Sequence, residues 1–243
     1  MFSPSTCSTI SRCWSRLFGW DETLGPLWAN PPRVIAHGGD HMNYHGMMVM
    51  DIPGGSVISL PHSHLEELAP VLLAGDTPPT ENARNFPPDQ VSRVIGPAFI
   101  GYAEVVTGSP LHPVQLLGPK EAPQIARLQE ACDAGEWEQG GSSLDGADAV
   151  CGVFAGDTLA SLAGYEIWDG TVAHISIVTH PEHRGMGYGR SSVAFLARHA
   201  AWKKLLPQYR TLEENVPSLA IARSLGFEHF GTSVAVRLKG AED

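Results

Sequence analysis

Hydrophobic and polar positions follow two different periods along this chain, and the change between them is clearest from residue 174 onward. Ile175, Ile177 and Val178 are β-branched residues in a run bounded by turn signals, which predicts a strand. Pro181 cannot donate to a sheet ladder, so the strand is expected to end there. Beyond the turn, apolar residues recur at helical spacing, at Val193, Leu196, Ala197 and Ala200. The pattern therefore predicts a strand, a turn and a helix in this order.

The predicted turn is rich in glycine and flanked by arginine. Gly185, Gly187 and Gly189 stand at every second position, with Arg184 before them and Arg190 after them. A strand that passes through glycines into a helix N-terminus presents several backbone N–H groups to one point, which favours an anion there. The spacing differs from the dinucleotide fingerprint Gly-x-Gly-x-x-Gly, and the Walker lysine with its Ser or Thr is missing.

The turn belongs to a pair of motifs that resemble a known family. Arg-Gly-x-Gly-x-Gly after a Val-x-x-Pro strand end resembles the pyrophosphate-binding turn of the GNAT superfamily of acetyl-CoA-dependent N-acetyltransferases. In that superfamily an Asn opens a short helix near the pantetheine arm of the cofactor, and Leu-Gly-Phe closes it; residues 215–227 carry both features. Pro217 or Ser218 suits a helix start, and Gly226 suits a left-handed stop. A glycine turn without a ligand is the alternative for the first motif taken alone.

The rest of the C-terminal half fits the same fold. The resemblance covers residues 112–238 and implies the α+β GNAT fold, a mixed, largely antiparallel sheet flanked by helices. The two strands on either side of the long helix are expected to splay apart where the thioester enters. Strands are predicted at 114–117, 149–155, 161–168, 209–213 and 234–238, and a helix, broken near Gly135, at 121–138. We therefore predict a GNAT acetyltransferase domain over residues 111–243.

The first 110 residues are predicted to form a smaller α+β domain that contributes to the acceptor site. An extra N-terminal half of this kind resembles the GNAT branch that includes some antibiotic-resistance acetyltransferases. Residues 76–90 carry four prolines and no hydrophobic period, which predicts a surface connection. A strand is expected at 98–106, with Tyr102 and Glu104 on one face. The other elements expected here are strands at 33–36, 46–51 and 56–60 and a helix at 64–73.

Two features near the N-terminus allow alternative interpretations. The first twenty residues have five serines, two arginines and no acid, as in a transit peptide, but they also fit an amphipathic helix, which we favour. His37, His41 and His45 lie within nine residues and suggest a metal site. Because Gly38 and Gly39 disfavour the helix that would align the three side chains, we expect no metal.

Charge and cysteine content limit the partners. The net charge of −10 argues against nucleic acid, whose phosphates require a basic face, and is compatible with a cationic amine substrate. The four cysteines show no C-x-x-C pairing, which favours free thiols in a reducing cytoplasm. No apolar run reaches the roughly 18–20 residues of a membrane span.

The resemblance also implies site residues. An amine needs a base to lose its proton, and His174, four residues before Val178, matches the base of some GNAT enzymes; Glu166 and Glu104 are rivals. The backbone amide near Val178 is expected to stabilise the thioester oxygen. The position of the tyrosine that acts as general acid in the family is Ala222 here, so that role is not transferred. Either Ser218 or a water protonates the thiolate, or the thiolate, a good leaving group, needs no acid. The expected cofactor-binding residues are Ile177, Val178, Arg184, Gly185, Met186, Gly187, Tyr188, Gly189, Arg190, Asn215 and Ser218.

These observations predict an acyltransferase that moves an acetyl group from acetyl-CoA to a primary amine of a small molecule, of the antibiotic, amino acid or polyamine type. The alternatives are an acyl-CoA-binding regulatory protein without turnover, which the alanine at position 222 would suit, and a protein N-acetyltransferase. The expected partners are acetyl-CoA and the amine. A homodimer is left open.

Overall fold

The computed structural model describes residues 2–28, 32–87, 89–141 and 146–239. The chain divides into two compact units. Unit 1 contains Met1–Ile100, Thr211–Val216 and His229–Asp243, and unit 2 contains Gly101–Arg210 and Pro217–Glu228. This grouping differs from the predicted domains 1–110 and 111–243, because β10 (Glu228–Leu238) pairs with a strand of the N-terminal half. The domain assignment itself stays a prediction.

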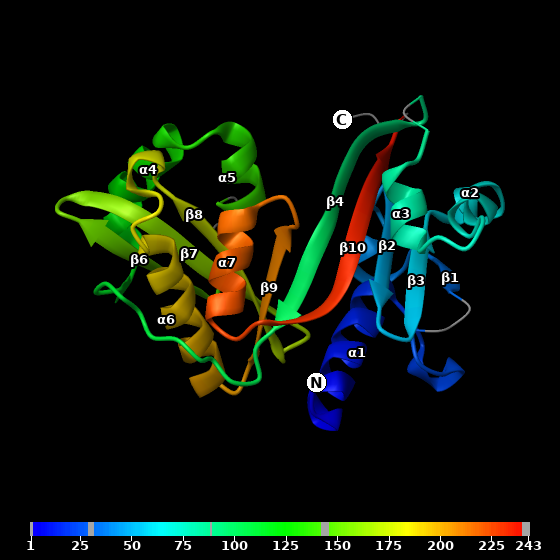
Figure 1. Cartoon of the computed structure of the whole chain (residues 1–243), viewed down its shortest axis with the longest axis horizontal. Helices are drawn as coiled ribbons and strands as arrows, with labels where there is room; N and C mark the ends of the chain where they lie inside the picture. Colours follow the sequence, from blue (N-terminus) through cyan, green and yellow to red (C-terminus); the bar gives the residue numbers. More distant parts are fainter. Residues whose placement is uncertain (1, 29–31, 88, 142–145, 240–243) are drawn as a thin grey trace. The chain divides into compact units, whose positions relative to one another are not determined.

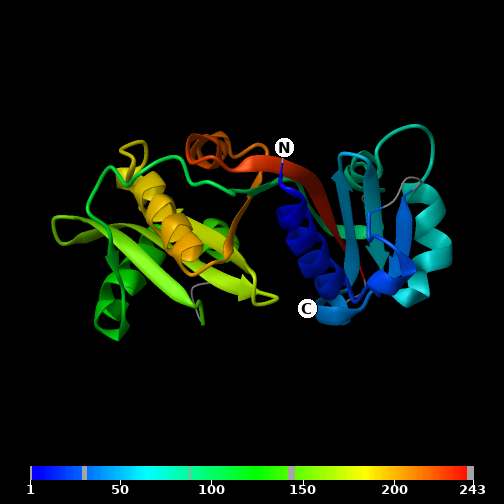
Figure 2. The ribbon, with the colours of Figure 1, turned by 90° about the horizontal axis from the view of Figure 1, so that it is seen from below.

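Unit 1 is built on five strands in the order β1-β3-β2-β10-β4. The central strand β2 is antiparallel to both of its neighbours, and β1 runs parallel to β3. Both faces of β2 are buried, so helices must cover the sheet on two sides, and Figure 2 shows α1 and α2 on opposite sides of it. The elements of this unit are α1 (Pro4–Phe18), β1 (Arg33–Ala36), β2 (Gly46–Ile52), β3 (Gly55–Leu60), α2 (Leu65–Leu72), α3 (Pro79–Arg84) and β4 (Val91–Tyr102).

Helix α1 confirms the amphipathic helix expected in the first twenty residues. Ser3 caps its N-terminus by accepting a hydrogen bond from the Thr6 amide, and Pro4 occupies its first turn, where no amide donor is needed. Gly19 ends the helix in the left-handed region, at φ 67°. Ile10, Trp14 and other apolar side chains of one stripe are buried, as amphipathic spacing requires.

Unit 2 carries the strands β9-β8-β7-β6-β5 in this order. Three antiparallel pairings join β5 to β8, and β9 runs parallel to β8. Helix α6 covers one face and α4 the other (Figure 2). The elements are β5 (Gln115–Leu116), α4 (Ala122–Ala131), α5 (Ala134–Gly140), β6 (Ala149–Ala155), β7 (Thr158–Trp168), β8 (Val172–Thr179), α6 (Tyr188–Trp202), β9 (Leu206–Leu212) and α7 (Val216–Ser224), coloured along the chain in Figure 1. The mixed, largely antiparallel sheet with flanking helices confirms the predicted fold class.

Three predicted elements differ from the structure. The strand expected at 98–106 ends at Tyr102, so Glu104 is not on a strand. The connection expected at 76–90 contains α3, whose first turn bonds Asp51: the carboxylate accepts from the Thr80 amide and hydroxyl. The helix expected at 121–138 is broken in two as predicted, but the break lies at Cys132 and Asp133 and not at Gly135, because the Asp133 carboxylate caps α5.

Candidate active site

Strands β8 and β9 separate from each other partway along their length. Their parallel pairing begins at Val172 opposite Leu206 and ends at Ile175 opposite Tyr209. Beyond that point β8 continues to Thr179 and β9 continues to Leu212. Over these last residues the two strands are no longer paired with each other, which is the splay that the family resemblance implied.

One backbone amide of β8 points into this splay. The β7–β8 register is regular throughout, and the His180 amide donates to the Ala160 carbonyl of the β7 side. Because amides alternate along an antiparallel strand, the Val178 N–H also faces β7, whereas the Ile177 N–H faces the β9 side. Of the two predicted residues, Ile177 is the one whose amide is directed between the strands.

The glycine turn leads directly into α6. Gly185 and Gly187 have φ values of 76° and 83°, in the left-handed region that glycine adopts most readily. The first i→i−4 hydrogen bond of α6 is the one that the Ser191 amide donates to the Gly187 carbonyl, at 3.0 Å. The three helical amides before it, at residues 188–190, precede this first bond, so they are the orphan donors of a helix N-terminus. The turn thus has the form of an anion site.

Two residues that the sequence reasoning missed hold the turn in place. The Ser191 hydroxyl donates to the Gly187 carbonyl and accepts from the amides of Leu111 and His112. The His112 ring lies 4.3 Å from the Tyr188 ring, and its Nε2 lies 2.8 Å from the Met186 carbonyl. Tyr188 therefore packs on the chain's own histidine. No sequence signal marked His112, because it precedes the turn by more than seventy residues.

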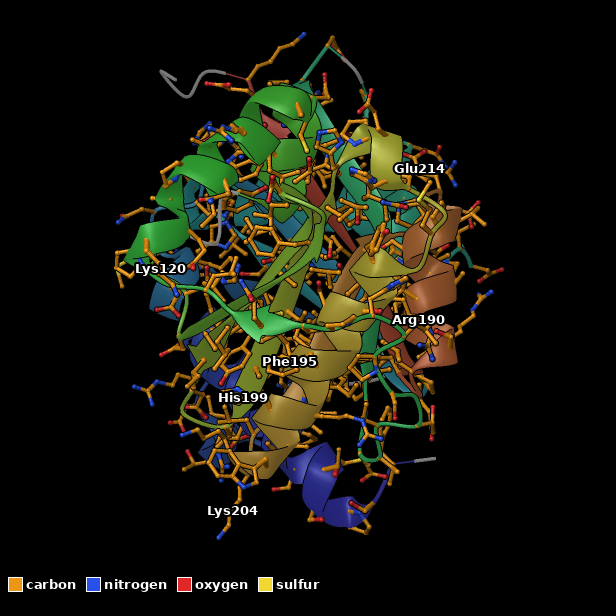
Figure 3. The ribbon with its side chains drawn as sticks, turned by 90° about the vertical axis from the view of Figure 1, so that its left-hand side faces the viewer. Lys120, Arg190, Phe195, His199, Lys204 and Glu214 are labelled. Atoms are coloured by element: carbon orange, nitrogen blue, oxygen red, sulfur yellow. The ribbon has the colours of Figure 1, made fainter. Side chains whose placement is uncertain are left out.

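Both arginines of the turn have partners within unit 2. Arg184 Nη2 lies 2.7 Å from Glu136 Oε2 of α5. Arg190, labelled at the start of α6 in Figure 3, donates to the Ser224 hydroxyl of α7 and to the Ser109 carbonyl. Arg190 therefore holds α6 to α7, whereas Arg184 is held by the exposed ion pair with Glu136 and by a longer bond, 3.4 Å, from its Nε to the Thr179 carbonyl.

His174 lies on β8 at the closed side of the splay. It stands directly opposite Glu166 of β7 in the register, so that both side chains are on one face of the sheet. The Trp168 ring stacks on the imidazole, with 4.1 Å between ring centroids. His174 Nδ1 lies 2.7 Å from Gln208 Oε1 of β9. The structure thus brings His174 and Glu166 together and adds Trp168 and Gln208.

Burial keeps the His174 ring neutral. The pKa of His174 is lowered to about 3, chiefly because desolvation disfavours the imidazolium and secondly because of the positive charge of Arg210. The hydrogen bond with Gln208 acts in the opposite direction but is the smaller effect. At neutral pH this histidine is therefore an uncharged ring.

The other predicted site residues, Glu104, Asn215 and Ser218, lie outside strands β7 and β8. Glu104 is an exposed residue beyond the end of β4. Asn215 immediately precedes α7, and its amide donates to the Leu212 carbonyl. Ser218, in the first turn of α7, lies with its hydroxyl 2.8 Å from that of Tyr209. Ala222 is fully buried, and burial raises the pKa of Tyr209 to about 12.

The N-terminal histidines are engaged in structural contacts. His37 lies 2.7 Å from the Ser59 hydroxyl and 2.8 Å from the Gly46 carbonyl, and burial lowers its pKa. His41 Nδ1 lies 2.9 Å from the Leu17 carbonyl. Within residues 2–28, 32–87, 89–141 and 146–239, no three His, Cys, Asp or Glu side chains form a group that could hold a metal ion. In the same part of the chain, no helix combines the length and hydropathy needed to cross a bilayer.

Comparisons with known proteins gave one family match and several similar solved structures. Residues 121–227 match the sequence model of the acetyltransferase (GNAT) family. No curated protein matches the chain. A GNAT-family acetyltransferase from Colwellia psychrerythraea is similar in structure at 16% identity and a TM-score of 0.49, over 62% of this chain and 59% of that one.

Two further structures are similar over comparable lengths. One, described as an acetyltransferase of the GNAT family from Novosphingobium aromaticivorans, has 24% identity and a TM-score of 0.48, over 62% of this chain and 67% of its own. The other, a GNAT-type N-acetyltransferase-like protein from Streptococcus suis, has 15% identity and a TM-score of 0.46, over 75% and 71%. The chain spans about three fifths of the length of the first of these relatives. Residues 121–227, somewhat less than half of the chain, thus carry a domain that matches the acetyltransferase (GNAT) family.

Proposed function

We propose that this protein is an acetyl-CoA-dependent N-acetyltransferase that moves the acetyl group to a primary amine of a small molecule by direct attack on the thioester. The observation that supports this most strongly is the end of β8–β9 pairing at Ile175 and Tyr209 while both strands continue. A gap of this kind exposes backbone donors inside a sheet, where an extended acyl-pantetheine chain can bond to them.

The diphosphate of the coenzyme binds at the glycine turn. The orphan amides at residues 188–190 and the helix dipole of α6 favour negative charge. A side chain on Gly185 would meet no atom within 4 Å, so the backbone there is open to a ligand. Arg184 is the cation that reaches the diphosphate, by exchanging its bond with Glu136. Met186, Gly187, Tyr188, Gly189 and Arg190 form the rest of the predicted turn, and Asn215 and Ser218 are assigned to the pantetheine arm.

The amide of Ile177 stabilises the charge that develops on the thioester oxygen. Attack by the amine converts the carbonyl to a tetrahedral centre with a negative oxygen, and a fixed N–H directed at that oxygen lowers the barrier. The neighbouring Val178 contributes its side chain, which packs with Leu128 and Leu162 on the face covered by α4 and α5. The two residues thus have different roles.

His174 is the proton acceptor of the reaction. Its ring is uncharged at neutral pH, so a lone pair is available to the N–H of the attacking amine. The nitrogen becomes cationic as the C–N bond forms and is then a much stronger acid than the free ammonium ion, so a weak base suffices. Glu166, opposite His174, is the group that can receive the proton or bind the amine. Glu104 is the third candidate.

The thiolate leaves without a tyrosine at the family's usual helix position, because that position is the buried Ala222. The nearest hydroxyl pair is Ser218 with Tyr209. Tyr209, with its raised pKa, keeps its proton and supports Ser218 as a hydrogen-bond donor or acceptor. Protonation of the thiolate is assigned to Ser218 or to water.

A transfer assay with a panel of amines tests the proposal. Purified protein, acetyl-CoA and antibiotics, amino acids or polyamines are assayed for thiol release and for the acetylated product, with protein N-terminal peptides included. Product from a small amine supports the proposal, and product from peptides alone supports the protein N-acetyltransferase. Tight coenzyme binding with no product from any amine supports the alternative of a non-catalytic acyl-CoA sensor, which the buried Ala222 favours. Absence of coenzyme binding contradicts both.

A further inference from the structure

A chain of polar side chains extends inward from His174. His174 Nδ1 lies 2.7 Å from Gln208 Oε1, and Gln208 Nε2 donates to the Tyr102 hydroxyl at 2.6 Å. Gln208 and Tyr102 are both fully buried (0% exposed). A buried carboxamide that bonds at both ends is held in place, because turning away from either partner would cost a buried hydrogen bond.

The orientation of this carboxamide determines where the imidazole proton lies. A carboxamide oxygen only accepts hydrogen bonds, so with Oε1 toward His174 the hydrogen must be on Nδ1. In a neutral ring the other nitrogen, Nε2, then has no hydrogen and carries the lone pair. The tautomer of His174 thus follows from the direction of Gln208 in the structure, where Oε1 faces the imidazole and Nε2 donates to the Tyr102 hydroxyl.

We propose that Gln208, held by Tyr102, is a positioning residue that fixes His174 as the Nδ1–H tautomer and presents Nε2 as the hydrogen-bond acceptor for the attacking amine. The inference rests on the proposed transferase function and adds a residue pair that the sequence reasoning did not select. Neither residue needs to touch the substrate: their effect passes through the imidazole. The same chain prevents rotation of the ring, which the Trp168 stack also restrains.

The charged groups around His174 are consistent with a neutral ring. Glu166 faces it from β7, and Arg210 comes from β9, two residues after Gln208. Arg210 and burial both disfavour the imidazolium. Gln208 is neutral at every pH, so it can hold the ring without drawing a proton onto Nε2. A carboxylate at position 208 would instead stabilise the doubly protonated ring.

The tautomer can be measured without any enzymatic assay. In protein labelled with ¹⁵N at histidine, the two ring nitrogens have distinct shifts, and His174→Gln identifies the His174 signals. We expect the Nδ1–H form in the wild type and a mixture of tautomers in Gln208→Leu. Tyr165→Phe is the matched control, because Tyr165 bonds His199 in the same unit, 3.0 Å from its Nδ1, and does not contact His174. An Nε2–H wild-type ring would overturn the inference.

Kinetics then separate positioning from mere support of the fold. In Gln208→Leu we expect kcat to fall on the order of 10- to 100-fold, the range known for loss of the hydrogen-bond partner of a metal-bound histidine, with a smaller fall in Tyr102→Phe and none in Tyr165→Phe. Coenzyme binding should be unchanged in all three. A Gln208→Leu protein with the mixed tautomer but wild-type kcat would overturn the role.

The variant Gln208→Glu gives a second test, in which the pKa of His174 should rise. The new carboxylate should raise the pKa of His174, so that an ionisation absent from the wild type between pH 5 and 8 appears in the pH profile and in the ¹⁵N shifts. If the wild-type ring itself titrates near its ordinary value, or if Gln208→Glu leaves its titration unchanged, the positioning role is overturned. If no amine is acetylated by the wild type, the shifts still decide the tautomer, and the proposed function alone fails.

Discussion

Arg184 of the glycine turn and Glu136 of α5 form an ion pair in which Nη2 and Oε2 lie 2.7 Å apart. Both side chains are about half exposed, at 48% and 47%. Exposed ion pairs contribute about 0–1 kcal/mol, because water competes for each partner. The pair is therefore weak enough for Arg184 to exchange the carboxylate for a coenzyme diphosphate. If the diphosphate binds at the turn as proposed, Glu136 competes with it for Arg184.

Removal of this competitor should strengthen coenzyme binding. In Glu136→Gln we expect the Kd for coenzyme A to fall about two- to fivefold, which corresponds to less than about 1 kcal/mol. In Arg184→Ala we expect it to rise about tenfold, because charged hydrogen bonds contribute roughly 1.5–3 kcal/mol. Calorimetric titration at low and high salt measures both, and Glu138→Gln on the same helix is the control. Weaker binding in Glu136→Gln would show that the ion pair supports the site.

Substitution of the three candidate bases should separate their roles. His174→Ala should lower kcat by roughly 10²- to 10⁴-fold, the range for loss of a general base, with the Kd for the coenzyme unchanged. Glu166→Gln should act mainly on KM for the amine if it binds the substrate, and Glu104→Gln should have little effect. Steady-state kinetics on each variant give the comparison. Full activity in His174→Ala would transfer the role to Glu166 or Glu104.

The elements around the site could be predicted from local sequence, because each has a strong local cause. Pro181 ends β8 within two residues of the predicted position, and Gly226 stops α7 with φ 85°. Alternation and turn residues placed β6 and the end of β7 at Trp168, although β7 begins three residues before the predicted start at Ser161. The break between α4 and α5 was misplaced because a cap at Asp133 outweighed the helix-breaking tendency of Gly135.

The partners of the site residues could not be predicted in the same way. Gln208 and Glu136 reach His174 and Arg184 from residues 34 and 48 positions away in the chain, and no periodicity links them. The end of the strand at Tyr102 also depends on a distant contact, because Ala103 donates its amide to the Pro207 carbonyl of β9. Long-range pairing of this kind leaves no local trace, so Glu104 was assigned to a strand that ends before it.

The lowered pKa of His174 makes folding stability depend on pH. The ring has a pKa of about 3 when folded and about 6.5 when unfolded. Between these values the unfolded chain binds the additional proton, so stability is lost as the pH falls from 6.5 toward 3. From pH 7 to pH 5 the loss due to this one ring should be on the order of 2 kcal/mol. Urea unfolding at the two pH values measures it.

His174→Gln is the reference for this measurement. Glutamine at position 174 can still donate to Gln208 but does not titrate. The loss of unfolding free energy between pH 7 and pH 5 should therefore be smaller in the variant by about 2 kcal/mol. His37 and His199, whose pKa values are also lowered by burial, contribute equally to both proteins and cancel. Equal pH dependence in the two proteins would mean that the folded ring takes up its proton as readily as the unfolded one.

Two glycines of the turn should respond to alanine for different reasons. At Gly189 an added Cβ would lie 2.6 Å from Thr179 Oγ1, so Gly189→Ala should destabilise unit 2 by about 1–3 kcal/mol through overpacking. At Gly185 the added Cβ meets nothing within 4 Å, but φ is 76°, so Gly185→Ala should cost about 1–2 kcal/mol through backbone strain. Thr179→Ala removes Oγ1 and should recover part of the loss in Gly189→Ala but none of it in Gly185→Ala. A double-mutant cycle by urea unfolding measures this coupling. Zero coupling between positions 179 and 189 would mean that β8 and α6 move apart to accept the added methyl group. The close approach of the strand to the helix would then not explain why residue 189 is a glycine.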